Sequence, residues 1–400
     1  MMGRREEYLW KRPIEREQSS MSKRPCEEPQ VDEPESEGVC WMRKSKVPRL
    51  GLVPCSHLNK RPARQRYLYL VLDDWERGYS IHRVDEDDFY SDAGLEARPA
   101  DCPVVRIEAQ HASSLSFAAH GTKILAMHPS GFSPGIPVFD TETLGMAVCP
   151  FPKSRAVLGA TNLVFASAGD RLFVFVSRYL EVLGPEPLPT HKSWSWTSVE
   201  PLPPFESRLV SSYALHPDGR TIFVSVKNWS SSVKAYHRNK RNSTFTFDTE
   251  QLEWTHLGEW LLPFRGRAHY DRDLDAWVGI CPFKEGAGHL SCCDIPPAVA
   301  CKTMPSWKLG KDVFFDEDHI RHSGATLVYM GDSRFCLIEC QVPEDNDSSP
   351  RLRVVTMTSF VLKYDKAGEL TAHHRAYASL SYHTAHENLN LDLDPVAFWM

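Results

Sequence analysis

The chain has 400 residues, 42% of them hydrophobic and 24% charged, so it can bury a large core and is neither fibrous nor wholly disordered. Its formal net charge of -6 gives no overall attraction to nucleic acid or to an anionic membrane surface, and no apolar run is long enough to cross a bilayer. With 29 prolines, 19 Phe, 13 Tyr and 11 Trp, the composition favours many short strands joined by turns.

The cysteines indicate a reducing compartment. There are 11 of them, an odd number spread along the chain, and residues 1–16 are charged and lack the apolar core of a secretory signal. Disulfides are rare where thiols are kept reduced. We therefore expect free thiols and an intracellular protein, cytoplasmic or nuclear.

The N-terminal residues differ in charge from the rest of the chain. Residues 1–66 hold 15 of the 46 basic and 10 of the 52 acidic residues, which leaves 31 basic and 42 acidic residues for positions 67–400. The acids are concentrated in residues 27–37 and the bases in residues 40–66, with prolines in both. Such segregated charge buries little apolar surface, so residues 1–66 are predicted to be a disordered, charged tail.

Within this tail, four bases form a short cluster that fits a nuclear import signal. They are Arg43, Lys44, Lys46 and Arg49. Short basic clusters are common, and the alternative is a solvated tail without a specific role.

From residue 67 the pattern changes to short β-forming runs separated by turns. Residues 67–72 form an apolar run that predicts a buried inner strand. Residues 116–124 read as a strand, a polar turn containing glycine and a second strand, and this pattern recurs at residues 212–222. A similar hairpin at residues 165–174 lies about 48 residues from each, a spacing typical of repeat architectures.

A second hairpin follows the first in each repeat. The sequence Phe-Asp-Thr-Glu at residues 139–142 recurs at residues 247–250. Two hairpins in roughly 50 residues have the size of one four-stranded propeller blade. We place the repeat units near residues 67–110, 111–160, 161–207, 208–262, 263–318 and 319–385.

The predicted architecture is all-β. It is a closed β-propeller of about six four-stranded blades over residues 67–386, followed by a C-terminal tail at residues 387–400. The alternative is a pair of stacked β-sandwich domains, which would show alternating strands without a 50-residue repeat. The repeated Phe-Asp-Thr-Glu favours the propeller.

One repeat resembles the kelch repeat, an aromatic-Asp pair followed by Trp, Leu and a trailing Leu-Pro. The matching residues are Phe247, Asp248, Trp254, Leu257, Leu262 and Pro263. The chain has no Gly-Gly pair, so its blades would be divergent kelch-like repeats.

A closer resemblance is carried by the segments at residues 69–74, 79–82, 138–141 and 360–365. They are similar to a plant family, expanded in cereal grasses, that is known only as a domain of unknown function. The resemblance covers residues 65 to 386 and implies a kelch-like core with no assigned activity.

Two patterns suggest catalysis or metal binding, and neither fits its context. Residues 131–135 match the Gly-x-Ser-x-Gly nucleophile elbow around Ser133, but Pro134 has no N–H to donate to an oxyanion. His373, His374 and His383 crowd the C-terminal region together with His386, yet alternation along a strand would place them on both faces. We predict no catalytic residues, no metal and no cofactor.

Two groups of cysteines are predicted to be core or edge residues. Cys292 and Cys293 are adjacent, so their side chains would point to opposite faces of a strand. Cys336 and Cys340 lie too far apart along a strand for a simple chelate.

A basic turn stands out within the acidic part of the chain. Arg238, Lys240 and Arg241 are either a solvated hairpin tip or a contact for an acidic partner. With no coherent catalytic set, we predict a monomeric, non-catalytic propeller that binds an unidentified protein, but not a specific nucleic acid or a membrane. The alternative is a small-ligand-binding or metal-binding enzyme that uses the central channel, because propellers host both kinds of function.

Overall fold

The computed structural model of the protein describes residues 65–90, 98–100, 102–108, 116–127, 135–152, 163–185, 194–229, 241–298, 303–343, 351–385 and 394–400. The chain divides into two compact units, residues 1–61 and 62–400, and all described residues belong to the second. Apart from Gln65 and Arg66, the predicted tail and its import cluster lie outside the described residues.

The described residues form strands and short 3-10 turns, with no α-helix among them. Blade 1 contains β25 (Val396–Trp399), β1 (Leu68–Trp75), β2 (Gly78–Val84) and β4 (Val105–Glu108), in that order across the sheet. Blade 2 contains β5 (Ser116–His120), β6 (Lys123–Met127), β7 (Ile136–Asp140) and β8 (Met146–Cys149). Blade 3 contains β9 (Val164–Ala168), β10 (Arg171–Val176), β11 (Tyr179–Leu183) and β12 (Trp196–Ser198).

The remaining blades follow the same antiparallel order. Blade 4 contains β13 (Val210–Leu215), β14 (Thr221–Trp229), β15 (Arg241–Asp248) and β16 (Glu253–Gly258). Blade 5 contains β17 (Arg265–Asp271), β18 (Ala276–Ile280), β19 (His289–Asp294) and β20 (Trp307–Val313). Blade 6 contains β21 (His322–Gly331), β22 (Arg334–Gln341), β23 (Leu352–Tyr364) and β24 (Leu370–His383), and β3 (Arg98–Pro99) adds to its outer strand.

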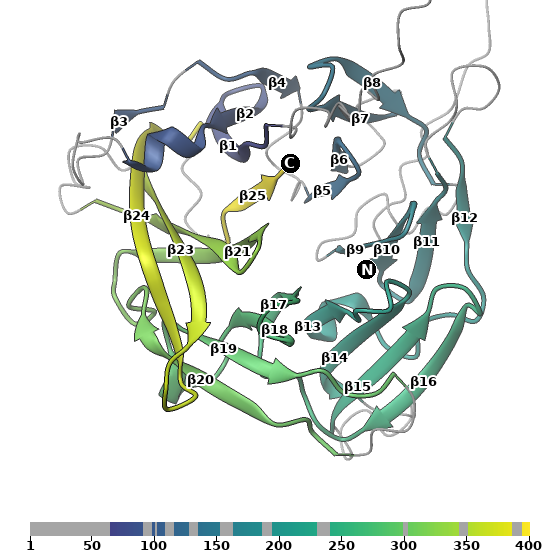
Figure 1. Ribbon diagram of the computed structural model, residues 1–400. Helices are drawn as coiled ribbons and strands as arrows, with labels where there is room; N and C mark the ends of the chain where they lie inside the picture. The colour runs from purple at the N-terminus through teal and green to yellow at the C-terminus, as the bar shows by residue number, and fades with distance from the viewer. Residues whose placement is uncertain are drawn as a thin grey trace, which may run out of the picture. The chain divides into compact units, whose positions relative to one another are not determined.

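Six apolar clusters lie between successive blades and close the ring. For example, one cluster joins Ile81 of blade 1 to Phe139 of blade 2, and another joins Ile338 of blade 6 to Leu70 of blade 1. The other four link blades 2 and 3, 3 and 4, 4 and 5, and 5 and 6. Figure 1 shows the six sheets arranged around a common centre. The predicted all-β propeller of about six four-stranded blades is therefore confirmed.

Burial on both faces explains the apolar runs in the sequence. In β10, Leu172 and Val174 pack toward blade 2, whereas Phe173 and Phe175 pack toward blade 4. Successive side chains of a strand point to opposite faces, so a sheet covered on both sides needs continuous apolar sequence in its middle strands. The same alternation holds in β1, whose run was predicted to be a buried inner strand.

The prediction of a C-terminal tail at residues 387–400 needs one correction. Residues 396–399 form β25, which pairs with β1 from Leu68↔Trp399 to Val71↔Val396 and becomes the innermost strand of blade 1. The main chains of Tyr67 and Met400 exchange two further hydrogen bonds, of 2.8 and 3.0 Å. Four residues are too few to show a strand pattern in the sequence, so only the pairing reveals this strand.

Candidate functional site

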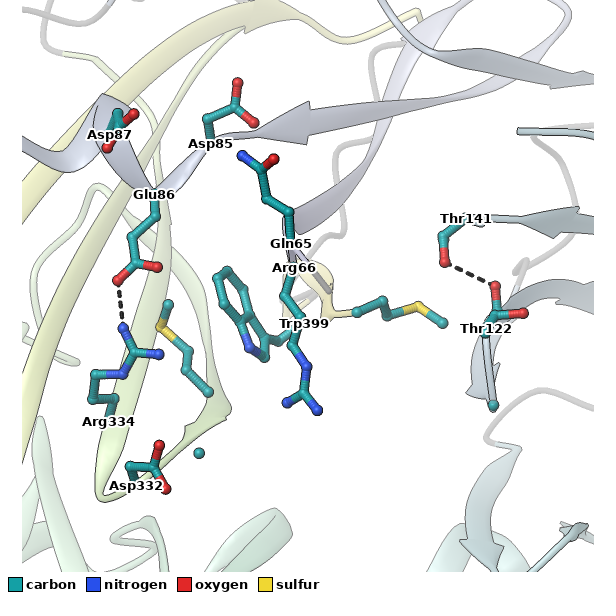
Figure 2. Close-up of a pocket in the computed structure, with 14 residues that line it drawn as sticks. Gln65, Arg66, Asp85, Glu86, Asp87, Thr122, Thr141, Asp332, Arg334 and Trp399 are labelled. Atoms are coloured by element: carbon teal, nitrogen blue, oxygen red, sulfur yellow. Dashed lines mark hydrogen bonds and ion pairs between the residues drawn. The ribbon is translucent and has the colours of Figure 1, made fainter. Parts of the chain in front are cut away.

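A pocket of about 1160 Å³ opens where the ring closes, and we call it the closure pocket. It is lined by residues of blades 1, 2 and 6, some in turns and some in strands (Figure 2). Blade 2 contributes the β5–β6 turn with Thr122, and blade 6 contributes the β21–β22 turn with Asp332. Blade 1 contributes residues 65–66, residues 85–87 and the end of β25.

A left-handed turn presents Asp332 to this pocket. The turn from β21 to β22 has positive φ at both Asp332 (52°) and Ser333 (57°), with Gly331 and Arg334 paired across it. Two-residue hairpin turns of this hand match the twist of the flanking strands, and Asp is among the few side chains that adopt this conformation readily. The turn therefore keeps Asp332 exposed at the pocket while both strands continue into the core.

The pocket carries more acidic than basic groups. Its charged lining consists of Arg66, Asp85, Glu86, Asp87, Asp332 and Arg334. Four of these groups are acidic and two are basic. An excess of two negative charges therefore faces this pocket.

The acids of the pocket differ in their partners. Glu86, in the 3-10 turn Glu86–Tyr90, forms an ion pair with Arg334 of blade 6. Asp85 lies 3.9 Å from Arg83. Neither Asp87 nor Asp332 forms a hydrogen bond or ion pair within the part of the chain that the structure describes. Among the carboxylates of the pocket, these two are the ones that are unpaired within the described residues.

An aromatic ring and a guanidinium also lie in the pocket. Figure 2 shows Arg66 extending beside Trp399 into the open space, with Asp332 on one side and Thr122 and Thr141 on the other. The Trp399 indole nitrogen is buried and has no hydrogen-bond partner among the described residues. The site thus combines carboxylates, an aromatic face and hydroxyl-bearing turns.

The chain matches one family model, described as "Protein of unknown function (DUF1668)", over residues 65–379. The chain belongs to this family. No curated protein matches it.

Solved structures similar to this DUF1668 protein are distant. Hydrazine synthase of Kuenenia stuttgartiensis is 13% identical, with a TM-score of 0.36 over 67% of this chain and 69% of that chain. A chain of the nidogen/laminin complex is 11% identical, with a TM-score of 0.39 over 81% of this chain and 99% of that one. Likenesses this weak say nothing about the activity of the DUF1668 protein. None of its described helical turns is long and apolar enough to span a membrane.

The repeated Phe-Asp-Thr-Glu of the DUF1668 chain has a structural role. Asp140 accepts hydrogen bonds from the Glu142 N–H (3.0 Å) and the hydroxyls of Thr122 and Thr143 (2.9 Å each), and lies 3.1 Å from the Lys123 ammonium. Asp248 likewise caps its own turn, accepting the N–H groups of residues 250 and 251. The motif therefore joins two neighbouring turns of one blade.

These bonds shift the titration of Asp140. Burial raises the pKa of its carboxyl, but hydrogen bonds from Glu142, Lys123, Thr143 and Thr122 outweigh burial and lower the pKa to about 2. A carboxyl whose pKa is lower in the folded than in the unfolded protein stabilises the fold above the unfolded value, and this stability is lost as the pH falls through the folded value.

Replacing Asp140 by Asn is therefore expected to lower the free energy of unfolding by about 1–2 kcal/mol at pH 7. The difference from the wild type should shrink as the pH falls from about 4 toward 2, because the wild-type carboxyl then takes up a proton. Urea denaturation at several pH values measures this difference in the free energy of unfolding. Asp170→Asn, on the β9–β10 turn, is the matched control, and an equal, pH-independent loss in both variants would contradict the assigned role.

The basic turn predicted as a partner contact is only partly described. Arg238 and Lys240 lie outside the described residues. Arg241 begins β15 and forms an ion pair with Glu259, and both side chains are more than half exposed. Its charge is therefore balanced locally and lies away from the closure pocket.

The histidines considered for metal binding do not converge where they are described. His373 and His374 are exposed on β24, the outer strand of blade 6, and His383 ends the same strand. His386 and Ser133 lie outside the described residues. Within the described ranges, no three His, Cys, Asp or Glu side chains are grouped so that they could hold a metal ion.

The four cysteines singled out in the sequence are buried, and none of them forms a disulfide within the described residues. Burial raises the pKa of Cys336 and raises that of Cys340 to about 11. Burial also raises the pKa of Cys292. A buried, protonated thiol is a poor nucleophile, and these side chains act as small apolar residues.

Two histidines on the innermost strands bind neighbouring blades. His120 of β5 lies 2.8 Å from the Ser167 hydroxyl of β9, and His269 of β17 lies 3.1 Å from the carbonyl oxygen of Leu327. Burial lowers the pKa of His269 to about 3, so its ring is neutral and donates this hydrogen bond. Both rings link inner strands of successive blades.

The sequence did not point to the residues of the closure pocket. The run of acids at residues 85–88 and the Gly331-Asp332 turn were visible signals. Glu86, in the acidic run, and Arg334, next to the turn, are 248 residues apart in the sequence. Only closure of the ring brings these two segments together.

Proposed function

We propose that this propeller is a non-catalytic module that binds another protein through the closure pocket and the turns around it. The observation that carries the proposal is the chemistry of the pocket lining. Small-molecule sites are mostly lined by hydrophobic and aromatic side chains with a few polar groups. Here six charged groups and two threonines line the pocket, against Met330, Trp399 and Met400 as its large apolar members. Such a lining suits the polar surface of a protein partner.

The alternative is a small-ligand-binding or metal-binding enzyme that uses the central channel. His120 and His269, on inner strands, are already engaged with Ser167 and Leu327 of neighbouring blades. Stabilisation of the protein against heat by a metabolite or a metal would favour this alternative over a protein partner.

The kelch-like nature of the blades is part of the proposal. In blade 4, Phe247 and Trp254 lie directly opposite each other on β15 and β16, with their ring centres 4.7 Å apart. Leu257 and Leu262 are buried in the same blade. These positions suit a divergent kelch repeat, and we extend the proposal to an origin in the plant family, expanded in cereal grasses, that the sequence resembles.

We infer an intracellular protein whose cluster of Arg43, Lys44, Lys46 and Arg49 directs nuclear import. The basic residues Arg238, Lys240 and Arg241 would then be a second, separate contact for a partner.

Substitution of Asp87 by Trp tests the binding surface. This bulky side chain would obstruct the pocket. A partner captured by the wild-type full chain, then purified, should therefore bind Asp87→Trp at least about tenfold more weakly, a loss of about 1.4 kcal/mol. The affinity is measured by calorimetry. The matched control is Asp318→Trp, an exposed residue of the β20–β21 connection. Equal affinity of wild type and Asp87→Trp would contradict a role for this surface.

A further inference from the structure

We infer that the closure pocket selects a cationic partner, an extended segment that inserts an Arg or Lys side chain into the space lined by Asp87, Asp332 and Trp399. This inference rests on the proposed function, because it names the chemistry of the partner at the same site. Three features of the pocket favour such a segment: its unpaired carboxylates, its aromatic ring and the cation that already extends into it.

Two carboxylates of the pocket are unpaired within the described residues. Glu86 is neutralised by Arg334, whereas Asp87 and Asp332 have no hydrogen bond or ion pair in the described ranges. They are held by different blades, Asp87 by the 3-10 turn of blade 1 and Asp332 by the hairpin turn of blade 6. Two fixed carboxylates that face one cavity attract a cation and repel an anion.

Trp399 adds an aromatic ring to the pocket lining. It lies in the pocket as the last residue of β25, and its pairing with Leu68 fixes its backbone. The face of a Trp ring attracts Lys and Arg cations, and the interaction strengthens where water is partly excluded. A ring that lines the same pocket as two unpaired carboxylates therefore favours a cationic side chain over other polar groups.

Arg66 places a cation in the pocket. Its side chain extends into the same pocket beside Trp399 (Figure 2). A guanidinium thus already lies within the space of this site. With a volume of about 1160 Å³, the pocket has room for further side chains. The remaining excess of negative charge is left for a second cation, which a partner would supply.

The test uses a fluorescent peptide of Gly, Ser and two Arg residues, and the same peptide with Glu in place of Arg. The variant Asp87→Asn with Asp332→Asn removes both unpaired charges, and Asn keeps the left-handed backbone at position 332. The matched control is Asp273→Asn with Asp318→Asn, two exposed acids outside the pocket. Thermal unfolding of each variant confirms that it is folded.

Exposed charge pairs contribute little individually, so we expect the Arg peptide to bind the pocket variant roughly three- to tenfold more weakly than the wild type. The control variant should bind like the wild type, the Glu peptide should not bind, and raised salt should weaken binding of the Arg peptide. The inference is overturned if the wild type does not bind the Arg peptide, binds both peptides equally, or loses the same affinity in both variants.

The two proposals can fail separately. If a purified partner loses affinity for Asp87→Trp but binds the double Asn variant like the wild type, the surface is confirmed and the cationic selectivity is wrong. If Asp87→Trp binds that partner normally, the proposed function itself is wrong.

Discussion

Removal of residues 396–400 is expected to lower the free energy of unfolding by about 4 kcal/mol or more, since each well-buried apolar side chain contributes about 1.5–3 kcal/mol. The lost strand, β25, is the innermost strand of blade 1 and pairs with four residues of β1. Its loss leaves the main chain of β1 unpaired on one side. It also uncovers apolar residues between blades 6 and 1, where Ala397 is 8% exposed. Urea denaturation measures the loss.

Two further experiments separate ring closure from a general effect of truncation. A synthetic peptide of residues 394–400, added in excess, should restore part of the lost stability, because binding to the folded form stabilises it by mass action. Ala397→Asp should destabilise the full chain strongly, since it buries an unpaired charge. Ala367→Asp makes the same change at an exposed turn. Equal stability of the truncated and full-length chains would show that the ring is held without β25.

Replacement of Asp271 by Ala is expected to lower the free energy of unfolding by about 3–5 kcal/mol, the usual result of breaking a buried charged network. Asp271 ends β17 and is fully buried. It accepts hydrogen bonds from the N–H groups of Asp273 (3.1 Å) and Leu274 (2.9 Å), and from the N–H (2.9 Å) and hydroxyl (2.8 Å) of Ser333. One carboxylate therefore joins the β17–β18 turn of blade 5 to the β21–β22 turn of blade 6.

The Ala variant leaves these buried donors without a partner, which accounts for the size of the effect. Asp271→Asn should lose less, because its amide oxygen still accepts hydrogen bonds. Ser333→Ala removes only the hydroxyl donor and should lose about 1 kcal/mol. Chemical denaturation measures the free energy of unfolding of the three variants. If Asp271→Ala is no less stable than Ser333→Ala, the Asp271 carboxylate does not have the assigned role of joining the two turns. The turn that carries Asp332 would also become mobile in Asp271→Ala.

The sequence predicted the strands and the blade number because burial on both faces imposes a readable pattern. β10 appears as a continuous apolar run for this reason, and the Phe-Asp-Thr-Glu repeat marks turns that Asp140 and Asp248 cap. The role of these aspartates was not visible, since their partners Thr122 and Arg220 lie on a different turn. The short strand β25 was missed because four residues carry no period.

The sequence by itself determined an all-β chain of about six repeated blades, because hydrogen bonding between adjacent strands and burial of both sheet faces act over short distances along the chain. Only the tertiary structure decided how the ring closes and which charges meet at the closure pocket. Glu86 and Arg334 come from the first and last blades, 248 residues apart. Their proximity follows from the closed geometry of the ring, as does the proximity of Asp87, Asp332 and Trp399 in one pocket.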